Sequence, residues 1–337
     1  MRDGSARPLT DRYDSALLDL DGVLYIGGDA VPGAPEAVAA ARAAGMRVAF
    51  VTNNASRTPD TVADHLTSLG VPATPADVVT SAQAAATLVA EVVPPGAAVL
   101  VVGGEGLDVA LAERGLRPVR RAADNPQAVV QGFAPDVGWR LLAEGAYAVR
   151  AGLPWIASNL DVTVPTADGF APGNGALVEV IAAATGRRPV SAGKPEIPLH
   201  REAVRRTGAL RPLVVGDRLD TDVEGANRAG VASLLVLTGV TTAVDLVLAE
   251  PAHRPTYVSA DLWSGLVGEH PPVRRHPDGG WTCGGWVCTV VPSGIALVGT
   301  GEPLDGLRAA CVACWQPDDV DRPDDGVVRE VVAGLGL

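Results

Sequence analysis

Long uncharged apolar runs are absent from this sequence of 337 residues, so no segment is predicted to span a membrane. The stretch from Met1 to Tyr13 is polar and charged with no apolar centre, which argues against a secretory signal. Basic clusters interleaved with aromatic residues are also absent, and the formal net charge is -12, which argues against nucleic-acid binding. We therefore expect a cytoplasmic protein that binds neither membranes nor nucleic acid.

Lysine is almost absent as well. The 27 Lys and Arg residues include one lysine, Lys194. Lysine presents a compact ammonium charge, whereas arginine presents a planar fork, so a site fitted to one rejects the other. Lys194 could be a chance survivor on a solvated surface, but its place between Gly193 and Pro195 favours a role in a loop.

Cysteine is scarce and confined to the last part of the chain. The chain has four cysteines: Cys283, Cys288, Cys311 and Cys314. The pair 283/288 and the pair 311/314 could together bind zinc. Two features favour small buried hydrophobic residues instead. Cys283 and Cys288 have opposite parity in what the pattern predicts as one strand, 281–291, and the other pair lies among small apolar residues. Disulfides are not expected in the cytoplasm.

Two aspartates follow the first strongly apolar run. Asp19, Asp21 and Gly22 come directly after a predicted buried strand that enters from Ala16. Ligands of open α/β sheets bind beyond the carboxyl ends of the strands. One acid could attack as a nucleophile and bind a divalent cation while the other exchanges a proton with the leaving group. An acidic turn after a strand gives the same pattern.

Polar residues also follow the next predicted strand, 47–51. A helix over 34–44 separates the two strands, which predicts a parallel pair with Thr52 at the same sheet edge as Asp19. The Thr52 hydroxyl, with Asn53 and Asn54, could hold phosphate oxygens. A cap for the helix that starts near Pro59 is the alternative.

A third acidic segment follows the predicted strand 212–215. Asp217 comes just after the end of that strand, as Asp19 comes just after the end of the first one, so the two carboxylates could bind the same cation. Asp222 could orient Lys194 or a metal-bound water by a hydrogen bond, without binding the metal itself. Alternatively, it could cap a helix N-terminus.

The strand and helix pattern predicts an α/β protein with a Rossmann-like parallel-sheet core. The core comprises 14–81 and 188–268, an α/β cap is inserted at 82–187, and an α+β appendage follows at 269–337, with a hairpin over 281–298 and helices over 304–315 and 327–335. Glycines 103, 104 and 106 lack dinucleotide spacing and predict a tight turn. The polar loop 158–175 could contact a ligand or be an ordinary turn.

Four segments together resemble the motifs of haloacid-dehalogenase-like phosphatases, in order: Asp19-Leu20-Asp21-Gly22-Val23, Val51-Thr52-Asn53-Asn54, Gly193-Lys194-Pro195 and Gly216-Asp217-Arg218-Leu219-Asp220-Thr221-Asp222. The cap, with Thr166, Gly169 and 172–175, resembles the class IIA cap subclass that includes nitrophenylphosphatase-like, phosphoglycolate and pyridoxal phosphate phosphatases. Tyr25 fits this subclass too. The arrangement with a further C-terminal segment looks most like the glycerol 3-phosphate phosphatases of high-GC bacteria.

This resemblance implies roles for the matching residues. Asp19 is implied as the nucleophile that forms an aspartyl-phosphate, and Asp21 as the general acid and base. The phosphoryl oxygens would be held by Thr52, Asn53, Asn54 and Lys194, and Mg²⁺ by Asp19, Asp217 and the backbone carbonyl of Asp21, with Asp222 behind them.

The expected substrate is a small phosphorylated metabolite. A carboxylate-bearing substrate would favour an arginine in the loop 158–175, which has none and carries Asn159, Asp161, Thr166 and Asp168, so a polyol phosphate such as glycerol 3-phosphate is favoured. Phosphoglycolate, a sugar phosphate and pyridoxal phosphate are alternatives. Two other classes stay open: a phosphosugar mutase, and a ligand-binding regulatory protein on a vestigial core. The chain could form a homodimer.

Overall fold

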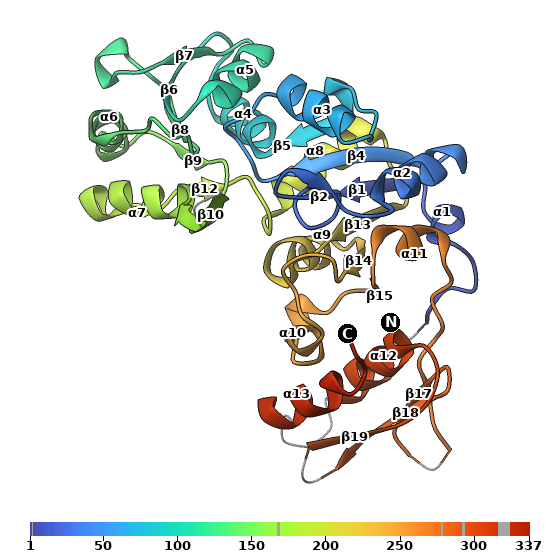
Figure 1. Ribbon diagram of the computed structural model, residues 1–337. Helices are drawn as coiled ribbons and strands as arrows, with labels where there is room; N and C mark the ends of the chain where they lie inside the picture. Colours follow the sequence, from blue (N-terminus) through green and yellow to red (C-terminus); the bar gives the residue numbers. More distant parts are fainter. Residues whose placement is uncertain (2, 167–168, 278, 292–293, 316–323) are drawn as a thin grey trace. The chain divides into compact units, whose positions relative to one another are not determined.

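The computed structural model describes residues 1, 3–166, 169–277, 279–291, 294–315 and 324–337. The chain divides into two compact units: the first comprises Met1–Val48 and Ala209–Leu337, and the second comprises Ala49–Gly208. Figure 1 shows helices against the faces of the sheets. Among the described residues, no helix has both the length and the hydropathy needed to cross a membrane.

The first unit is organised by parallel strands in the order β15-β14-β13-β1 (Figure 1). Leu17 lies opposite Val214, and every residue of β1 is buried, as expected for a strand covered on both faces. The elements are α1 (Leu9–Arg12), β1 (Ser15–Leu18), β2 (Tyr25–Ile26), β3 (Asp29–Ala30), α2 (Ala34–Ala43), β13 (Pro212–Gly216), the π-helical turn η3 (Leu219–Val223), α9 (Glu224–Ala229), β14 (Ala232–Val236), α10 (Ala243–Val247), η4 (Pro251–His253), β15 (Tyr257–Ser259) and α11 (Leu262–Val267).

The C-terminal part of the first unit is an antiparallel sheet with two helices. The sheet has the order β16-β17-β18-β19, and the elements are β16 (Arg274–Arg275), β17 (Trp281–Cys283), β18 (Trp286–Val291), β19 (Gly294–Gly299), α12 (Pro303–Cys314) and α13 (Asp325–Ala333). One apolar core joins this part to the parallel strands, because Leu235 and Val258 belong to the same buried cluster as Leu307 and Val328. The two parts are therefore packed as a single body.

The hairpin predicted for this region is confirmed only in part. The segment 281–291 is two strands joined by a turn at Gly284 and Gly285, so the prediction of one strand is wrong. Trp281 pairs with Cys288 and Cys283 pairs with Trp286, which places both cysteines on the same face of the sheet. The argument from opposite parity therefore fails, and both side chains are buried on that face.

The second unit contains a parallel pair and a separate five-stranded parallel sheet in the order β12-β9-β8-β6-β7. Strand β4 begins in the first unit and ends in the second. The elements are β4 (Arg47–Thr52), α3 (Pro59–Ser68), η1 (Pro75–Asp77), β5 (Val78–Thr80), α4 (Ser81–Val92), β6 (Ala98–Val102), α5 (Glu105–Glu113), β7 (Arg117–Val119), η2 (Ala122–Asp124), β8 (Ala128–Gln131), α6 (Trp139–Arg150), β9 (Trp155–Ala157), β10 (Thr163–Thr166), β11 (Gly169–Pro172), α7 (Asn174–Thr185), β12 (Val190–Ser191) and α8 (Ile197–Thr207).

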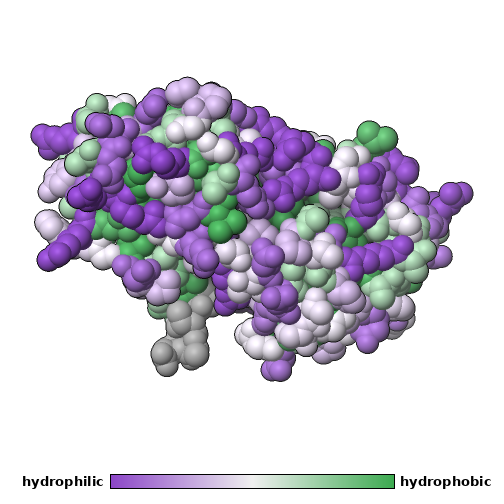
Figure 2. All heavy atoms as spheres, turned by 90° about the horizontal axis from the view of Figure 1, so that it is seen from above, coloured by the Kyte–Doolittle hydropathy of each residue, from purple (hydrophilic) through white to green (hydrophobic). Residues whose placement is uncertain are grey.

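The five-stranded sheet has its own apolar core. Leu100, Val129 and Trp155 from its strands are buried together with Ile181 of α7. On the face drawn in Figure 2, hydrophilic residues are interspersed with small apolar groups. The predicted α/β class, with parallel sheets, an inserted α/β part and an α+β C-terminal part, is confirmed. The predicted domain boundaries at residues 82, 188 and 269 stay a prediction.

Candidate active site

The two acidic segments of the first unit meet at the carboxyl ends of neighbouring strands. Asp19 follows β1 and donates its backbone N–H to Val215 of β13, at 2.8 Å, while Asp217 follows β13 itself. One carboxylate oxygen each from Asp19, Asp217 and Asp222 lies within 4.8 Å of the others. Asp217 and Asp222 are each 1% exposed. Carboxylates so close and so poorly hydrated repel one another, and oxygen-rich sites of this kind fit a hard divalent cation such as Mg²⁺.

A loop after β14 holds Asp217. The Val240 N–H donates to Asp217 Oδ2 at 2.7 Å, and the Thr241 N–H donates to the Asp217 carbonyl at 3.2 Å. Thr238 Oγ1 donates to the carbonyl of Gly22, at 2.5 Å, in the turn that carries Asp21. The loop 238–241 thus contacts both acidic segments. Sequence reasoning missed it, although Gly239, which follows the apolar run 232–237 and Thr238, was a signal of a close backbone approach.

Asp222 lies on the π-helical turn η3. Its Oδ2 accepts the backbone N–H of Arg218 at 3.2 Å, which closes the turn on the Asp217 side. The N-cap of the following helix, α9, is Val223, so the interpretation of Asp222 as a helix cap is wrong. A side chain at Gly216 would place its Cβ about 2.2 Å from the Asp222 Cγ, so glycine is needed there.

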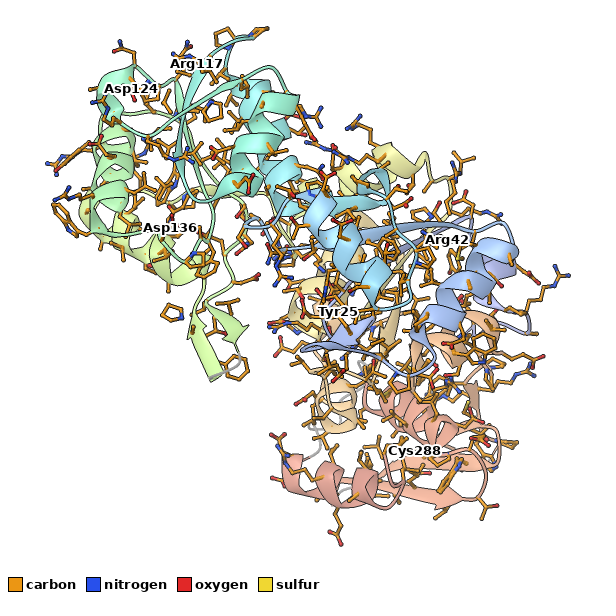
Figure 3. All side chains as sticks on the ribbon, turned by 45° about the horizontal axis from the view of Figure 1, so that its top comes forward. Tyr25, Arg42, Arg117, Asp124, Asp136 and Cys288 are labelled. Carbon is orange, nitrogen blue, oxygen red and sulfur yellow. The ribbon has the colours of Figure 1, made fainter. Side chains whose placement is uncertain are left out.

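Asp21 is exposed and lies beside an aromatic hydroxyl. Tyr25 Oη donates to Asp21 Oδ2 at 3.4 Å, and Tyr25, labelled in Figure 3, is 7% exposed. Gly22 has a φ of +79°, in the left-handed region that favours glycine, which allows the chain to reverse directly after Asp21. An exposed carboxyl group with a hydroxyl neighbour can exchange a proton with a bound substrate.

In the second unit, a turn follows β4. Thr52 is 5% exposed, and its Oγ1 accepts the backbone N–H of Asn54 at 3.1 Å. Asn54 Oδ1 accepts the backbone N–H groups of Ser56 and Arg57, at 2.9 and 3.1 Å. The Asn54 side chain therefore builds the turn, as asparagine commonly does. The helix α3 is capped by Thr58, so Thr52 and the asparagines do not cap it.

Asn53 joins this turn to Lys194. Asn53 Oδ1 accepts the backbone N–H of Lys194 at 2.7 Å, and Nδ2 donates to the Lys194 carbonyl at 3.1 Å. Nδ2 also lies 3.2 Å from both carboxylate oxygens of Asp161. Lys194 is 5% exposed, and its Nζ donates to the Val51 carbonyl of β4 at 3.4 Å. The interpretation of Lys194 as a residue on a solvated surface is wrong, because the ammonium group is buried beside the end of β4.

The loop 158–175, expected as a ligand contact or an ordinary turn, contains regular structure. It contains the antiparallel pair β10 and β11, and Asn159 Nδ2 donates to the Asn53 carbonyl at 2.7 Å. Asn159 Oδ1 accepts the backbone N–H of Asp161, whose carboxylate accepts from Asn53 Nδ2. The side chains of Asn159 and Asp161 therefore both make hydrogen bonds within the second unit. These two residues shape the loop around Asn53. Asp168 and the side chain of Thr166 lie outside the described residues.

The four cysteines carry free thiols. In the part of the chain that the structure describes, the only group of three or more Asp, Glu, His or Cys side chains close enough to share a metal is the acidic one above. Burial raises the pKa of Cys283 and Cys288 to about 12 and that of Cys314 to about 11. Cys288, labelled in Figure 3, lies with Cys311 in the apolar core of the C-terminal part. The expectation of buried thiols is confirmed for Cys283, Cys288 and Cys311, whereas Cys314 is half-buried.

Known proteins match almost the whole chain. Family models for haloacid dehalogenase-like hydrolases match residues 16–117 and 191–264, and a model for a GCN5-related N-acetyltransferase-like domain matches 283–337. The chain is 47% identical over 319 residues to a D-glycerol 3-phosphate phosphatase of Mycobacterium tuberculosis, covering 94% of this chain and 89% of that protein. It is 38% identical to the 5'-nucleotidase YutF of Bacillus subtilis, covering 74% of this chain and 96% of that one.

Solved structures agree with these relatives. A glycerol phosphate phosphatase from Mycobacterium tuberculosis in complex with magnesium superposes with a TM-score of 0.86 at 44% identity, covering 98% of this chain and 99% of that one. A 4-nitrophenylphosphatase from Thermotoga maritima superposes with a TM-score of 0.70 at 30% identity, covering 76% and 97%. With its acids at the carboxyl ends of β1 and β13, the chain belongs to the haloacid dehalogenase-like hydrolases.

Proposed function

We propose that this chain is a Mg²⁺-dependent phosphatase that hydrolyses glycerol 3-phosphate through an aspartyl-phosphate intermediate. The observation that carries the proposal is the cluster of Asp19, Asp217 and Asp222, in which Asp217 and Asp222 are buried and Asp19 is half-buried. It is supported by the similarity to a glycerol 3-phosphate phosphatase over most of both chains and to a structure that contains magnesium.

The proposed chemistry has two steps, which use the two acids of the first motif. In the first step an Asp19 carboxylate oxygen attacks phosphorus, the bond from phosphorus to the substrate oxygen breaks, and Asp21 donates a proton to that leaving oxygen. In the second step Asp21 takes a proton from water, whose oxygen attacks phosphorus and releases phosphate from Asp19. Asp21 ends in its starting protonation state.

Charge repulsion explains why the other acids are needed. A dianionic phosphate repels a carboxylate nucleophile, and bound Mg²⁺ would supply the positive charge that offsets this repulsion. Asp19, Asp217 and the backbone carbonyl of Asp21 would hold the ion. Asp222, which is buried on η3, would not bind the ion itself but would help to orient the groups that do.

The residues after β4 and Lys194 would hold the phosphoryl group. The Thr52 hydroxyl and the Lys194 ammonium group are the donors we assign to its oxygens. Asn53 and Asn54 would position the groups that bind phosphate. The Asn53 side chain holds the backbone of Lys194, and the Asn54 side chain holds the turn after Thr52. This division of work between the two asparagines refines the sequence prediction that both bind phosphate.

Phosphoglycolate, sugar phosphates and pyridoxal phosphate stay alternative substrates. The argument from the loop 158–175 is weaker than the sequence suggested, because Asn159 and Asp161 are used within the unit. The preference for glycerol 3-phosphate therefore rests on the relative. We also propose a cytoplasmic location, supported by the free thiols of all four cysteines, and a homodimer as the state to be tested by light scattering.

Phosphate release from a panel of phosphomonoesters tests the proposal. We expect release in Mg²⁺, none in EDTA, and the highest kcat/KM for glycerol 3-phosphate. Asp19→Asn should lower kcat by at least about four orders of magnitude, because it removes the covalent path. Ser68→Ala, at an exposed site on α3, is the matched surface control. Release from no substrate would overturn the assignment as a phosphatase, and a higher kcat/KM for phosphoglycolate would overturn the preferred substrate.

A further inference from the structure

The loop that holds Asp217 runs directly into a short helix. Val240 and Thr241 donate to Asp217, and α10 begins two residues later, at Ala243. Thr242 is its N-cap: Thr242 Oγ1 accepts the backbone N–H of Asp245 at 3.2 Å, and Asp245 Oδ2 accepts the Thr242 N–H at 3.0 Å. This reciprocal pair fixes the direction in which the loop enters the helix. A shift of α10 would therefore move the donors to Asp217.

The other side of α10 packs on the C-terminal helices. Leu246 and Val247 are 0% and 1% exposed, and α10 contacts both α12 and α13. The buried cluster that contains them includes Leu307 of α12 and Val332 of α13. Because protein interiors are close-packed, a cluster of this kind transmits a change in volume to its neighbours.

The same cluster reaches the second acidic residue. Val223, adjacent to Asp222 and 1% exposed, belongs to it, and Leu219 at the start of η3 packs against it. The loop that donates hydrogen bonds to Asp217 and the turn η3 that carries Asp222 are thus both next to elements of the apolar core that the C-terminal part completes.

We propose that α12 and α13 position the carboxylates of Asp217 and Asp222 for cation binding, through α10 and η3. The inference rests on the proposed function in one respect, that these acids form the Mg²⁺ site. Affinity for Mg²⁺ depends on ligand oxygens held close to ideal octahedral positions. A cavity in the shared core lets α10 and η3 relax toward it, and the oxygens then leave those positions.

Binding of Mg²⁺ by calorimetry, beside Mg²⁺-dependent phosphate release, tests the inference in the full-length protein. Val332→Ala on α13 removes two methyl groups inside the shared core. Val38→Ala on α2 removes the same two groups at a buried position outside that core, and the two valines are 3% and 1% exposed. We expect Val332→Ala to raise the Kd for Mg²⁺ about tenfold, with kcat at saturating Mg²⁺ within about twofold of the parent, since supporting residues typically tune metal affinity by that order. Val38→Ala should leave the Kd unchanged.

A second variant guards against a loss of folding. Thr242→Ala removes the exposed cap of α10 without touching the core and should also raise the Kd. An unchanged Kd in both Val332→Ala and Thr242→Ala, or an equal rise in Val38→Ala, would overturn the inference. Mg²⁺ binding by the parent protein without release of phosphate would instead contradict the proposed function, and the comparison of Kd values would still decide the inference.

Discussion

At the scale of single residues, the position of Asp217 depends on two glycines that lie against its carboxylate. A Cβ at Gly22 would come within 2.5 Å of Asp217 Oδ2, and a Cβ at Gly239 within 2.0 Å of the same oxygen. Asp217 is buried and bonded to Val240, so it cannot move aside at little cost. The backbone approaches the acid this closely only because both positions lack a side chain.

Gly239→Ala should therefore displace the Asp217 carboxylate. We expect Mg²⁺-dependent phosphatase activity at least about a hundredfold lower, because the proposed role of Asp217 as a metal ligand needs its carboxylate in place. Gly28→Ala is the control, because nothing lies within 4 Å of a Cβ there. Steady-state kinetics of the two variants, with thermal unfolding of each, would separate the effects. Activity of Gly239→Ala close to that of Gly28→Ala would contradict this account of the loop.

A single histidine should make stability depend on pH. His270 is 2% exposed, its Nε2 lies 2.8 Å from the Gly265 carbonyl, and burial lowers its pKa to about 4. The unfolded chain binds this proton near the ordinary pKa, about 6.5, while the folded protein does not. The free energy of unfolding should therefore fall as the pH drops from about 6.5 to about 4, by at most about 3 kcal/mol from this residue.

Urea unfolding of the parent and of His270→Gln at pH 7 and pH 4.5 measures this contribution. Glutamine keeps an N–H that can donate to Gly265 and does not titrate. We expect the variant to lose less unfolding free energy between the two pH values than the parent does. Equal losses in both proteins would show that His270 is protonated alike in the folded and the unfolded chain.

At the scale of elements, the buried ion pair on α12 links this helix to β15. Arg308 Nη1 donates to Asp305 Oδ1 at 2.7 Å, and Nη2 donates to the Val258 carbonyl at 2.9 Å. Taken as whole residues, Arg308 and Asp305 are 6% and 8% exposed, so the pair is buried. A buried charge that loses its partner is strongly destabilising, even where the intact pair contributes little.

Arg308→Met should lower the free energy of unfolding by about 3–5 kcal/mol, because Asp305 stays buried without its partner. The double variant Asp305→Leu with Arg308→Met should recover most of this loss, since both charges are then absent. Urea unfolding of the parent, the single variants and the double variant gives the coupling directly. A double variant as unstable as Arg308→Met would show that the carbonyl contact to Val258 matters more than the unpaired acid.

Elements with strong local signals could be predicted from the sequence, and those set by contacts far along the chain could not. The acids after β1 and β13 followed from apolar runs that end at Asp19 and Asp217, and the structure brings them together. The turn at Gly284 was missed, because apolar residues on both sides of it suggested one continuous strand. The use of Asn53 to hold Lys194 depends on residues more than a hundred positions apart, which no local pattern reports.

At the scale of the whole molecule, the C-terminal part shares its apolar core with the parallel strands of the first unit. Leu235, Leu246 and Val258 lie before residue 268 and belong to the same buried cluster as residues of α12 and α13. The sequence indicated a separable appendage, since composition and pattern change near His270. Packing across that boundary could not be seen from the sequence, because both partners are ordinary apolar residues.

Removal of residues 269–337 should therefore unfold or aggregate the remainder. The truncation exposes the side chains of Leu235, Leu246 and Val258 together, and contiguous exposed apolar surface of this kind promotes association. We expect the 1–268 fragment in the insoluble fraction, or soluble only as aggregates that bind a hydrophobic dye. The full-length Val332→Ala protein, in which one side chain is shortened within the same core, should stay monodisperse under identical conditions. A monodisperse fragment with a Kd for Mg²⁺ equal to that of the parent would mean that the parallel strands close this face without the C-terminal part, and its helices would then have no share in placing the acids.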